Sequence, residues 1–302
     1  MGSTKLEIVG MVITHILGGI GNQMFQYAAA RALSLSKGQQ LYLDVQDFEG
    51  YSLHSGFQLN TVFGLDAKLA GPELIRKTLG FRNQKFIKKL IKRPLFKHLR
   101  GCHFIMEPHA HYWPQIEVVP DDCYLYGYWQ SEKYFEGFEK LIREDFRFQG
   151  PLDSKNAALK NDIDKKTAVS VHVRRGDYVS DSKTSQIMHV CGIRYYEDAI
   201  RTIAMQVDSP HFYIFSDDMQ WVRENLSLPY SVTYVDQNLG KNSYIDMRLM
   251  SACKHNIIAN SSFSWWGAWL NPNPTKIVIA PSRWFINSNN DSDVVPSTWV
   301  LI

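Results

Sequence analysis

Two adjacent arginines follow a short apolar run in the middle of the chain, in the segment HVRRGDY at residues 172–178. If the preceding run AVSVHV is a strand, His172 and Arg174 share one face and Arg175 starts on the other. A guanidinium can hold a phosphate at two points, which an ammonium cannot. The segment therefore indicates a phosphate site centred on Arg174 or, alternatively, a structural Arg–Asp ion pair at a strand end.

Small hydroxyl residues open a helical stretch near the end of the chain, where NSSFSWWGAWL occupies residues 260–270. Asn and Ser are favoured at helix N-caps, so a plain cap is one interpretation. The free N–H groups of a helix N-terminus also bind phosphate, and the two roles are compatible. Because Trp265, Trp266 and Trp269 lie inside the helix, we expect them to pack in the core rather than stack on a sugar.

Two adjacent carboxylates, Asp217 and Asp218, follow another apolar run in the segment FSDD. They match poorly the acidic motif of Mn²⁺-dependent glycosyltransferases, in which one residue separates the aspartates. A carboxylate beyond a strand end can instead accept hydrogen bonds from a guanine edge or a ribose hydroxyl. The four cysteines are scattered and show no zinc spacing, so we expect free thiols and no metal site.

A glycine-rich turn, GGIGNQ at residues 18–23, joins a strand-like run at 11–17 to a helical stretch at 22–36. The G-x-G-x-x-G fingerprint fails because its third glycine is Met24, and the chain has no Walker A sequence. The turn is either a tight strand-to-helix connection or a place where a ligand approaches the backbone. In the second case, the amides of Asn22 and Gln23 can bind sugar hydroxyls.

The elements that must position these residues alternate in the second half of the chain. Short β-branched runs at 168–173, 212–215, 231–235, 256–259 and 276–280 are each followed by polar residues, and helical stretches lie between them. This alternation predicts a parallel sheet with helices on both faces. Ligands of such sheets bind beyond the carboxyl ends of the strands, which is where the polar residues stand.

Length and composition predict two globular domains. A chain of 302 residues with 45% hydrophobic and 13% aromatic residues is long and apolar enough for two cores, which excludes disorder. The first half opens with the same strand, turn and helix pattern, followed by a second strand at 41–44. Polar residues after Gly150 separate the halves, so we place the domains at residues 1–150 and 151–302.

A basic segment at residues 76–100 holds about ten Lys and Arg and no acidic residue, mixed with apolar side chains. It is a solvated amphipathic helix, a surface for anionic membranes, or a nucleic-acid site; the net charge of +3 disfavours the last. The apolar stretch at 8–17 is too short to span a membrane. We expect a cytoplasmic protein that binds no nucleic acid, with peripheral contact at the inner face of the membrane as one hypothesis.

Four motifs occur in a characteristic order: GGIGNQMFQYA, HVRRGDYV, FSDD and NSSFSWWGAWL. Together they resemble glycosyltransferase family 11, the α-1,2-fucosyltransferases, in a bacterial form. The resemblance covers residues 13–284. The H-x-R element alone identifies only a wider group, because α-1,6 and protein O-fucosyltransferases share it.

The resemblance implies an α/β, GT-B-like fold, in which two Rossmann-like domains face a cleft. It implies GDP-β-L-fucose as the donor, bound by the C-terminal domain, and inverting transfer to the 2-hydroxyl of a terminal galactose in a glycan. It also implies that no metal and no cofactor takes part.

The same resemblance assigns roles to individual residues. Arg174 binds the β-phosphate, with His172 and Asp177 in the same pocket. Arg175 is expected near the donor as well, but because it starts on the other face of the strand, its main role is packing or an ion pair. Asp217 or Asp218 holds guanosine, and Ser261, Ser262 and Phe263 contact the diphosphate. Gly19, Asn22 and Gln23 face the cleft from the acceptor-side domain.

The group that removes the acceptor proton stays open. Asp177 and Asp181 lie near the phosphate loop, Asp44 and Asp47 follow the second strand, and Glu107 lies in an aromatic region; the leaving phosphate is a further alternative. The alternative function in the same class is a GDP-sugar transferase of another donor or linkage. A kinase or NTPase is disfavoured by the lack of a P-loop, and a carbohydrate-binding module by the arginine-rich loop.

Overall fold

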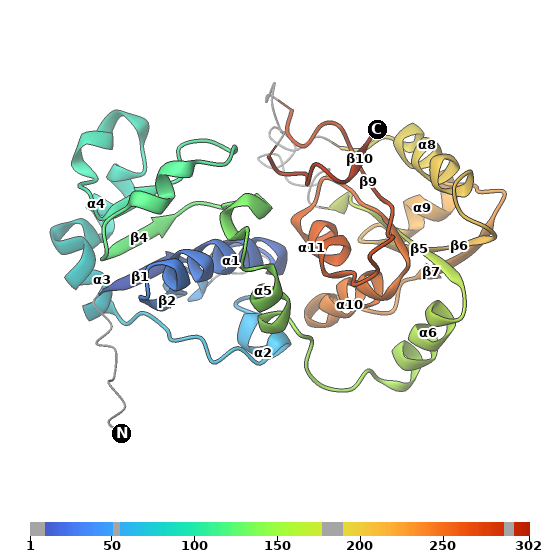
Figure 1. The fold of residues 1–302 in the computed structure, drawn as a ribbon, viewed down its shortest axis with the longest axis horizontal. Coiled ribbons are helices and arrows are strands. Elements are labelled where there is room, and N and C mark those ends of the chain that lie inside the picture. Colours follow the sequence, from blue (N-terminus) through green and yellow to red (C-terminus); the bar gives the residue numbers. More distant parts are fainter. Residues whose placement is uncertain (1–9, 51–54, 177–189, 287–292) are drawn as a thin grey trace. The chain divides into compact units, whose positions relative to one another are not determined.

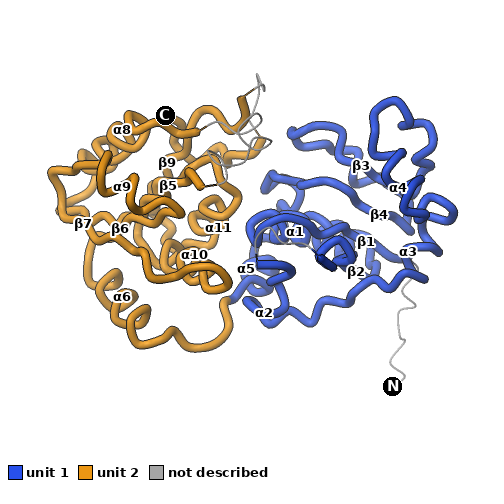
Figure 2. Tube along the Cα trace, turned by 180° about the vertical axis from the view of Figure 1, so that it is seen from behind, with its two compact units in different colours: residues 1–147 blue, residues 148–302 orange. Residues whose placement is uncertain are grey.

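The computed structural model describes residues 10–50, 55–176, 190–286 and 293–302. The chain divides into two compact units, Met1–Arg147 and Phe148–Ile302 (Figure 2). The sequence-based boundary after residue 150 falls among the first residues of the second unit. Each unit is built on its own parallel sheet.

The described residues of the first unit form a four-stranded sheet of order β2-β1-β4-β3 (Figure 1). Its strands are β1 (Met11–His15), β2 (Gln40–Asp44), β3 (Phe104–Met106) and β4 (Cys123–Tyr126), all paired in parallel. The other elements are α1 (Ile20–Ser36), η1 (Gln46–Phe48), α2 (Leu59–Phe63), α3 (Pro72–Leu79), η2 (Gly80–Asn83), α4 (Lys85–Ile91), η3 (Pro94–Leu99), η4 (Pro114–Val118), η5 (Glu132–Phe135) and α5 (Glu139–Asp145).

Strand β1 is buried along its whole length, because helices cover both faces of the sheet. Met11 and Ile13 pack in a cluster with Ile75 of α3 and Ile91 of α4. On the other face, the hydroxyl of Thr14 contacts the carbonyl oxygen of Gln26 in α1 at 3.5 Å. The strand ends at His15 and α1 begins at Ile20, so the predicted strand was two residues too long and the helix two residues late.

The described residues of the second unit form a six-stranded parallel sheet of order β10-β9-β8-β5-β6-β7. Its strands are β5 (Thr167–Val173), β6 (Pro210–Ser216), β7 (Ser231–Val235), β8 (His255–Ile257), β9 (Val278–Ala280) and β10 (Val300–Leu301). The helices are α6 (Ser154–Asp164), α8 (Ile193–Ala204), α9 (Met219–Asn225), η7 (Gly240–Asn242), α10 (Tyr244–Ala252) and α11 (Ser262–Leu270).

This strand order has a reversal point between β5 and β8. The chain winds outward from β5 to β6 and β7, returns to β8 beside β5, and then winds outward to β9 and β10. Such a doubly wound sheet opens a crevice at its reversal, beyond the carboxyl ends of the two central strands. The residues after β5 and β8 are therefore placed together by the topology.

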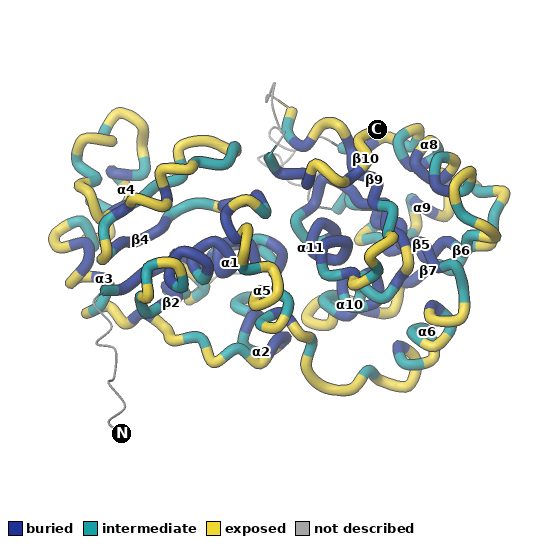
Figure 3. The backbone as a smooth tube through the Cα atoms, viewed as in Figure 1, coloured by how far each residue is buried: buried dark blue, intermediate teal, exposed yellow. Residues whose placement is uncertain are grey.

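Alternation along β5 decides which residues reach that crevice. Val169, Val171 and Val173 pack into a buried cluster with residues of α8. Figure 3 colours most of β5 as buried. Ser170 and His172 take the opposite face, where the amide of Asn256 donates to the Ser170 hydroxyl at 2.7 Å. The apolar half of the strand thus anchors it in the core, while the polar half faces α10 and α11.

Candidate active site

The end of β5 and the start of α11 meet at the reversal point of the second sheet. The rings of His172 and Phe263 lie 5.6 Å apart between centroids. Ser261 is the N-cap of α11, in an extended conformation, and its side chain makes no capping hydrogen bond. The first N–H groups of this helix are therefore not used by its cap, which leaves a position suited to an anion.

Arg174 is held by the first of the two adjacent aspartates. Its Nη1 lies 3.0 Å from Oδ2 of Asp217, and about a quarter of each side chain is exposed. The other oxygen of Asp217 accepts a 2.9 Å hydrogen bond from the backbone N–H of Arg175. A Cβ on Gly176 would lie 2.6 Å from Oδ2 of Asp217, so a larger residue there would displace this carboxylate from Arg174. Arg174 thus forms the ion pair that was one of the two predicted alternatives. The phosphate site stays a prediction, and this ion pair lies just beyond the end of β5.

Arg175 points to a different set of partners. Its Nε lies 3.3 Å from Oδ2 of Asp218, and its guanidinium carbon lies 3.8 Å from the centre of the Trp221 ring. Asp218 also caps α9, because its Oδ1 accepts from the N–H of Trp221 at 3.2 Å. Arg175 and Asp218 therefore hold the loop after β5 against the loop after β6. The ion pair agrees with the role expected for Arg175, and contact of either residue with the donor stays a prediction.

His172 is a neutral, buried residue of the site. Burial lowers the pKa of its imidazole to about 4; Asp217 opposes this shift and Arg174 adds to it. The ring is therefore uncharged near neutral pH. Its Nδ1 is buried and has no hydrogen-bond partner in the described part of the chain. Asp177 and Asp181 lie outside the described residues.

Asn260 fixes the loop between β8 and α11. Its amide donates to the carbonyl oxygen of Trp284 at 2.9 Å, and the thiol of Cys191 lies 3.5 Å from its Oδ1. Sequence reasoning did not find this link, because nothing in the spacing of Cys191 or Trp284 relates them to Asn260. Asn260 thereby positions the two serines that follow it.

The expected burial of the tryptophans and the expected free thiols are confirmed. Trp265, Trp266 and Trp269 are buried, and the indole N–H of Trp265 donates to the carbonyl oxygen of Val294 at 2.7 Å. All four cysteines are free thiols, and only Cys102 is exposed. None of the three helical tryptophans is placed to stack on a sugar.

In the first unit, the glycine-rich turn is fastened by amide side chains. Gly18 has a φ of 80°, which favours glycine, and Gly19 is the N-cap of α1. The amide nitrogen of Gln23 donates to the carbonyl oxygens of Gly18 at 2.9 Å and Gly56 at 2.8 Å, and its oxygen accepts from the N–H of Gln58. Gln23 is fully buried, so it has a structural role where we expected ligand contact.

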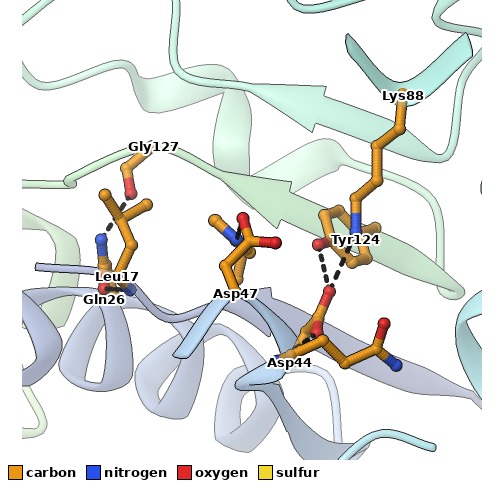
Figure 4. A network of polar contacts seen from close by, with 9 residues as sticks. Leu17, Gln26, Asp44, Asp47, Lys88, Tyr124 and Gly127 are labelled. Atoms are coloured by element: carbon orange, nitrogen blue, oxygen red, sulfur yellow. Dashed lines mark hydrogen bonds and ion pairs between the residues drawn. The ribbon is translucent and has the colours of Figure 1, made fainter. Parts of the chain in front are cut away.

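Two other amides act in the same region. Asn22 is partly exposed, and its oxygen accepts from the amide of Gln130 at 2.8 Å. Gln26 accepts from the N–H of Leu17 and donates to the carbonyl oxygen of Gly127, joining the ends of β1 and β4 (Figure 4). The sequence does not indicate this role of Gln26, because a glutamine inside a helix shows no pattern that distinguishes a buried position from an exposed one.

The carboxylates considered as proton acceptors in the first unit have different surroundings. Asp44 is buried between the ammonium of Lys88, at 3.1 Å, and the hydroxyl of Tyr124 (Figure 4). Both oxygens of Glu107 accept backbone N–H groups, from Tyr128 and Trp129, and burial raises the pKa of this carboxyl to about 7. Asp47 is exposed and pairs with His15 at 2.8 Å.

The described residues contain neither a metal-binding cluster nor a membrane-spanning helix. No group of three or more His, Cys, Asp or Glu residues is arranged to hold a metal ion there. Within the same residues, no helix is both long and apolar enough to cross a bilayer.

Comparison with known proteins shows which family the chain belongs to. The sequence profile of the family described as Glycosyl transferase family 11 matches residues 5–302. The chain belongs to this family.

The names of similar proteins differ in the sugar that is transferred. The chain is 36% identical to an alpha-1,2-colitosyltransferase of Escherichia coli, over 97% of this chain and 99% of that protein. It is 24% identical to galactoside alpha-(1,2)-fucosyltransferase 2 of Rattus norvegicus, over 87% of this chain and 68% of that protein.

A solved structure shares the fold. The crystal structure of NodZ alpha-1,6-fucosyltransferase soaked with GDP-fucose matches with a TM-score of 0.55 at 16% identity, over 87% of this chain and 93% of that chain. The expected α/β fold of GT-B type, built on parallel sheets, is thereby confirmed.

Proposed function

We propose that this family 11 protein transfers L-fucose from GDP-β-L-fucose to the 2-hydroxyl of a terminal galactose in a glycan, with inversion at the anomeric carbon. The observation that carries the proposal is that the end of β5, which leads into Arg174, meets the start of α11 at the reversal point of the second sheet, where the rings of His172 and Phe263 lie 5.6 Å apart. The fold shared with a fucosyltransferase that was soaked with GDP-fucose supports this donor.

The residues of this site act on the leaving diphosphate. In the proposal, Arg174 offers a fixed positive charge to the departing phosphate, and Asp217 keeps that guanidinium in place. The first N–H groups of α11, near Ser262 and Phe263, supply further donors. The neutral imidazole of His172 adds no charge and packs beside the ring of Phe263. We propose that no metal or cofactor takes part, because these groups can stabilise the leaving GDP.

A second candidate function is transfer of colitose, the 3-deoxy counterpart of L-fucose. It is favoured by the 36% identity to a colitosyltransferase, against 24% to a mammalian fucosyltransferase. The two donors differ by one hydroxyl. A site that hydrogen-bonds this hydroxyl rejects the deoxy donor strongly, by roughly 10⁴–10⁵-fold, whereas a site that does not bind it accepts both.

The experiment compares donors directly. The purified chain is incubated with GDP-L-fucose, GDP-colitose or GDP-mannose and a panel of β-galactosides, and each product linkage is assigned by NMR. We expect the highest kcat/KM with GDP-fucose and a new bond at the galactose 2-hydroxyl. A marked preference for GDP-colitose would establish the second candidate, and a bond at position 3, 4 or 6 would refute the linkage.

We also propose that the enzyme works in the cytoplasm, in peripheral contact with an anionic membrane. Figure 3 shows exposed stretches around α4. Phe86 and Leu95 are each more than three-quarters exposed, and the cations of Lys85, Lys89 and Arg93 are exposed beside them. Exposed apolar side chains among cations are the pattern that binds the interface of anionic bilayers.

Vesicle flotation tests this contact. We expect the chain to float with vesicles containing phosphatidylglycerol and not with neutral vesicles, and less so at high salt. A variant with Phe86→Ser and Leu95→Ser should lose this binding. The matched control changes exposed lysines of the second unit, Lys155 and Lys254, to Ser. Equal flotation with neutral vesicles, or an equal loss in the control, would refute the proposal.

A further inference from the structure

The first sheet also has a reversal point, between β1 and β4. In the order β2-β1-β4-β3, the chain moves from β1 outward to β2 on one side, whereas β3 and β4 lie on the other. The crevice of such a sheet lies beyond the carboxyl ends of its central strands. His15 ends β1 and Tyr126 ends β4, and their rings stack with centroids 4.9 Å apart.

A buried histidine holds an exposed carboxylate at this point. Nε2 of His15 lies 2.8 Å from Oδ2 of Asp47, which belongs to η1 just after β2. The side chain of His15 is 2% exposed and that of Asp47 is 60% exposed. Nδ1 of His15 is buried without a hydrogen-bond partner among the described residues. Asp47 is thus the one hydrogen-bond partner that the described structure gives to this buried ring.

The surrounding charges keep Asp47 ionised. The hydrogen bond from His15 lowers the pKa of Asp47 to about 2; Lys92 and Lys88 act in the same direction, and partial burial opposes them. The ammonium of Lys92 also lies 4.2 Å from the centre of the Tyr126 ring. The neighbouring Asp44 is paired with Lys88.

We propose that Asp47, positioned by His15, binds a hydroxyl of the acceptor sugar at the carboxyl edge of the first sheet. An ionised carboxylate accepts hydrogen bonds from sugar hydroxyls. The inference rests on the proposed function, because that function makes the acceptor a glycan. Asp47 touches the acceptor, and His15 is a positioning residue.

The test measures acceptor binding apart from turnover. Lactose, as the β-galactoside probe, is titrated by NMR into the unaltered chain and its variants in the presence of GDP, and acceptor and donor KM are then measured. Asp47→Asn should weaken lactose binding and raise acceptor KM by about 10- to 100-fold, the loss expected for a hydrogen bond to a charged group. Donor KM and the rate of donor hydrolysis should not change.

Two further variants separate positioning from folding. His15→Leu should reproduce the loss, whereas His15→Gln should retain binding, since a glutamine amide can still donate to Asp47. The matched control is Asp121→Asn. Asp121 is 70% exposed and pairs with Lys37 at 3.4 Å, but it precedes β4 and so lies at the opposite edge of the same sheet.

The outcomes distinguish this inference from the proposed function. Unchanged lactose binding in Asp47→Asn, an equal loss in Asp121→Asn, or an equal rise in donor KM would overturn the inference. A chain that binds lactose through Asp47 but transfers nothing from GDP-fucose would support the inference and refute the proposed donor. If the Asp47→Asn variant transfers fucose with a normal acceptor KM, the proposed donor is supported and the inference about Asp47 is refuted.

Discussion

Neighbouring residues of one motif have different roles here. Arg174 and Arg175 are adjacent, yet the first pairs with Asp217 and the second with Asp218 and the ring of Trp221. The alternation of β5 explains the difference, because successive side chains leave a strand on opposite faces. At the scale of single residues, the motif thus divides into a position that borders the crevice and one that braces it.

Replacing Arg174 should remove stabilisation of the leaving group. We expect Arg174→Ala to lower kcat by about 10²–10⁴-fold, equivalent to about 3–5 kcal/mol in the transition state. Arg174→Lys should not restore the rate, because an ammonium lacks the planar two-point contact. Steady-state kinetics at matched melting temperatures provides the measurement.

Arg175→Ala is the comparison for that experiment. It should lose less activity but lower the melting temperature, because the cation over Trp221 and the pair with Asp218 both disappear. Equal losses of kcat in both variants would mean that both guanidiniums grip the diphosphate. Near-normal turnover in Arg174→Ala would contradict the assignment of the site.

At the scale of elements, loops are held by buried side chains that come from distant segments. In the first unit, Gln23 and Gln26 of α1 tie the turn after β1 to residues 56–58 and to the end of β4. In the second unit, Asn260 ties the start of α11 to Trp284. Buried hydrogen bonds therefore fix the sheet edges that carry polar residues where they meet the helices.

Gln23→Met tests the structural role of this glutamine. The change keeps the volume but removes hydrogen bonds to Gly18, Gly56 and Gln58. We expect the free energy of unfolding to fall by about 2–4 kcal/mol, since buried backbone groups lose their partners. Denaturant unfolding measures this change. Asn22→Ala, which removes one hydrogen bond from Gln130, should cost less. Normal stability together with lost acceptor affinity would restore the ligand role first expected for Gln23.

A second test at this scale uses pH. Burial raises the pKa of Asp246 in α10 to about 7, against the lowering effect of the hydrogen bond from Asn238. Between its ordinary pKa of 3.8 and 7, the folded state therefore binds more protons than the unfolded state, so stability falls as pH rises through this window.

Asp246→Asn should remove part of this pH dependence, because an asparagine oxygen can still accept from Asn238. We expect the melting temperature near pH 8 to rise by about 2–4 °C, the effect of ~1 kcal/mol in a domain of 150–250 residues. Glu107, whose pKa is raised to about 7, should keep some of the slope in the variant. Calorimetry from acid to mildly alkaline pH measures the melting temperature and its dependence on pH. If this dependence is unchanged in Asp246→Asn, Asp246 carries no buried charge.

At the scale of the whole molecule, each unit repeats one arrangement. Both sheets are parallel, both have a reversal point, and in both the polar residues lie beyond the carboxyl ends of the central strands. The second unit presents Arg174 and the N-terminus of α11 there, and the first presents the pair of His15 and Asp47. The two edges thus offer groups suited to a diphosphate and to sugar hydroxyls.

The chemistry of these groups predicts activity without added metal. Asp217 and Asp218 are each paired with an arginine, so neither stands ready as a metal ligand. In the proposed reaction, the guanidinium of Arg174 supplies the positive charge at the diphosphate. We expect transfer to persist after dialysis against EDTA and to be unchanged by Mn²⁺ or Mg²⁺. Activity lost to EDTA and restored by Mn²⁺ would contradict this.

The sequence by itself determined the family, the α/β class and most strand positions of the second unit. These are local properties, because β-branched runs and the polar residues after them are read from neighbours in the chain. The non-equivalence of Arg174 and Arg175 could also be predicted from alternation alone. Among the predicted strands, only β7 has both ends as predicted, and the others differ by one to two residues, since backbone pairing with adjacent strands sets where a strand ends.

Only the tertiary structure decided which side chains pair. Asp217 lies beside Arg174, Asp47 beside His15, and Gln23 beside Gln58, although each pair is separated by more than thirty residues. Such partners are chosen by strand order and by helix packing, which no local pattern specifies. Tertiary packing likewise gives Asp44 and Asp47 different surroundings. Three residues apart in sequence, one is buried against Lys88 because β2 carries it under α4, and the other is exposed because η1 turns it outward.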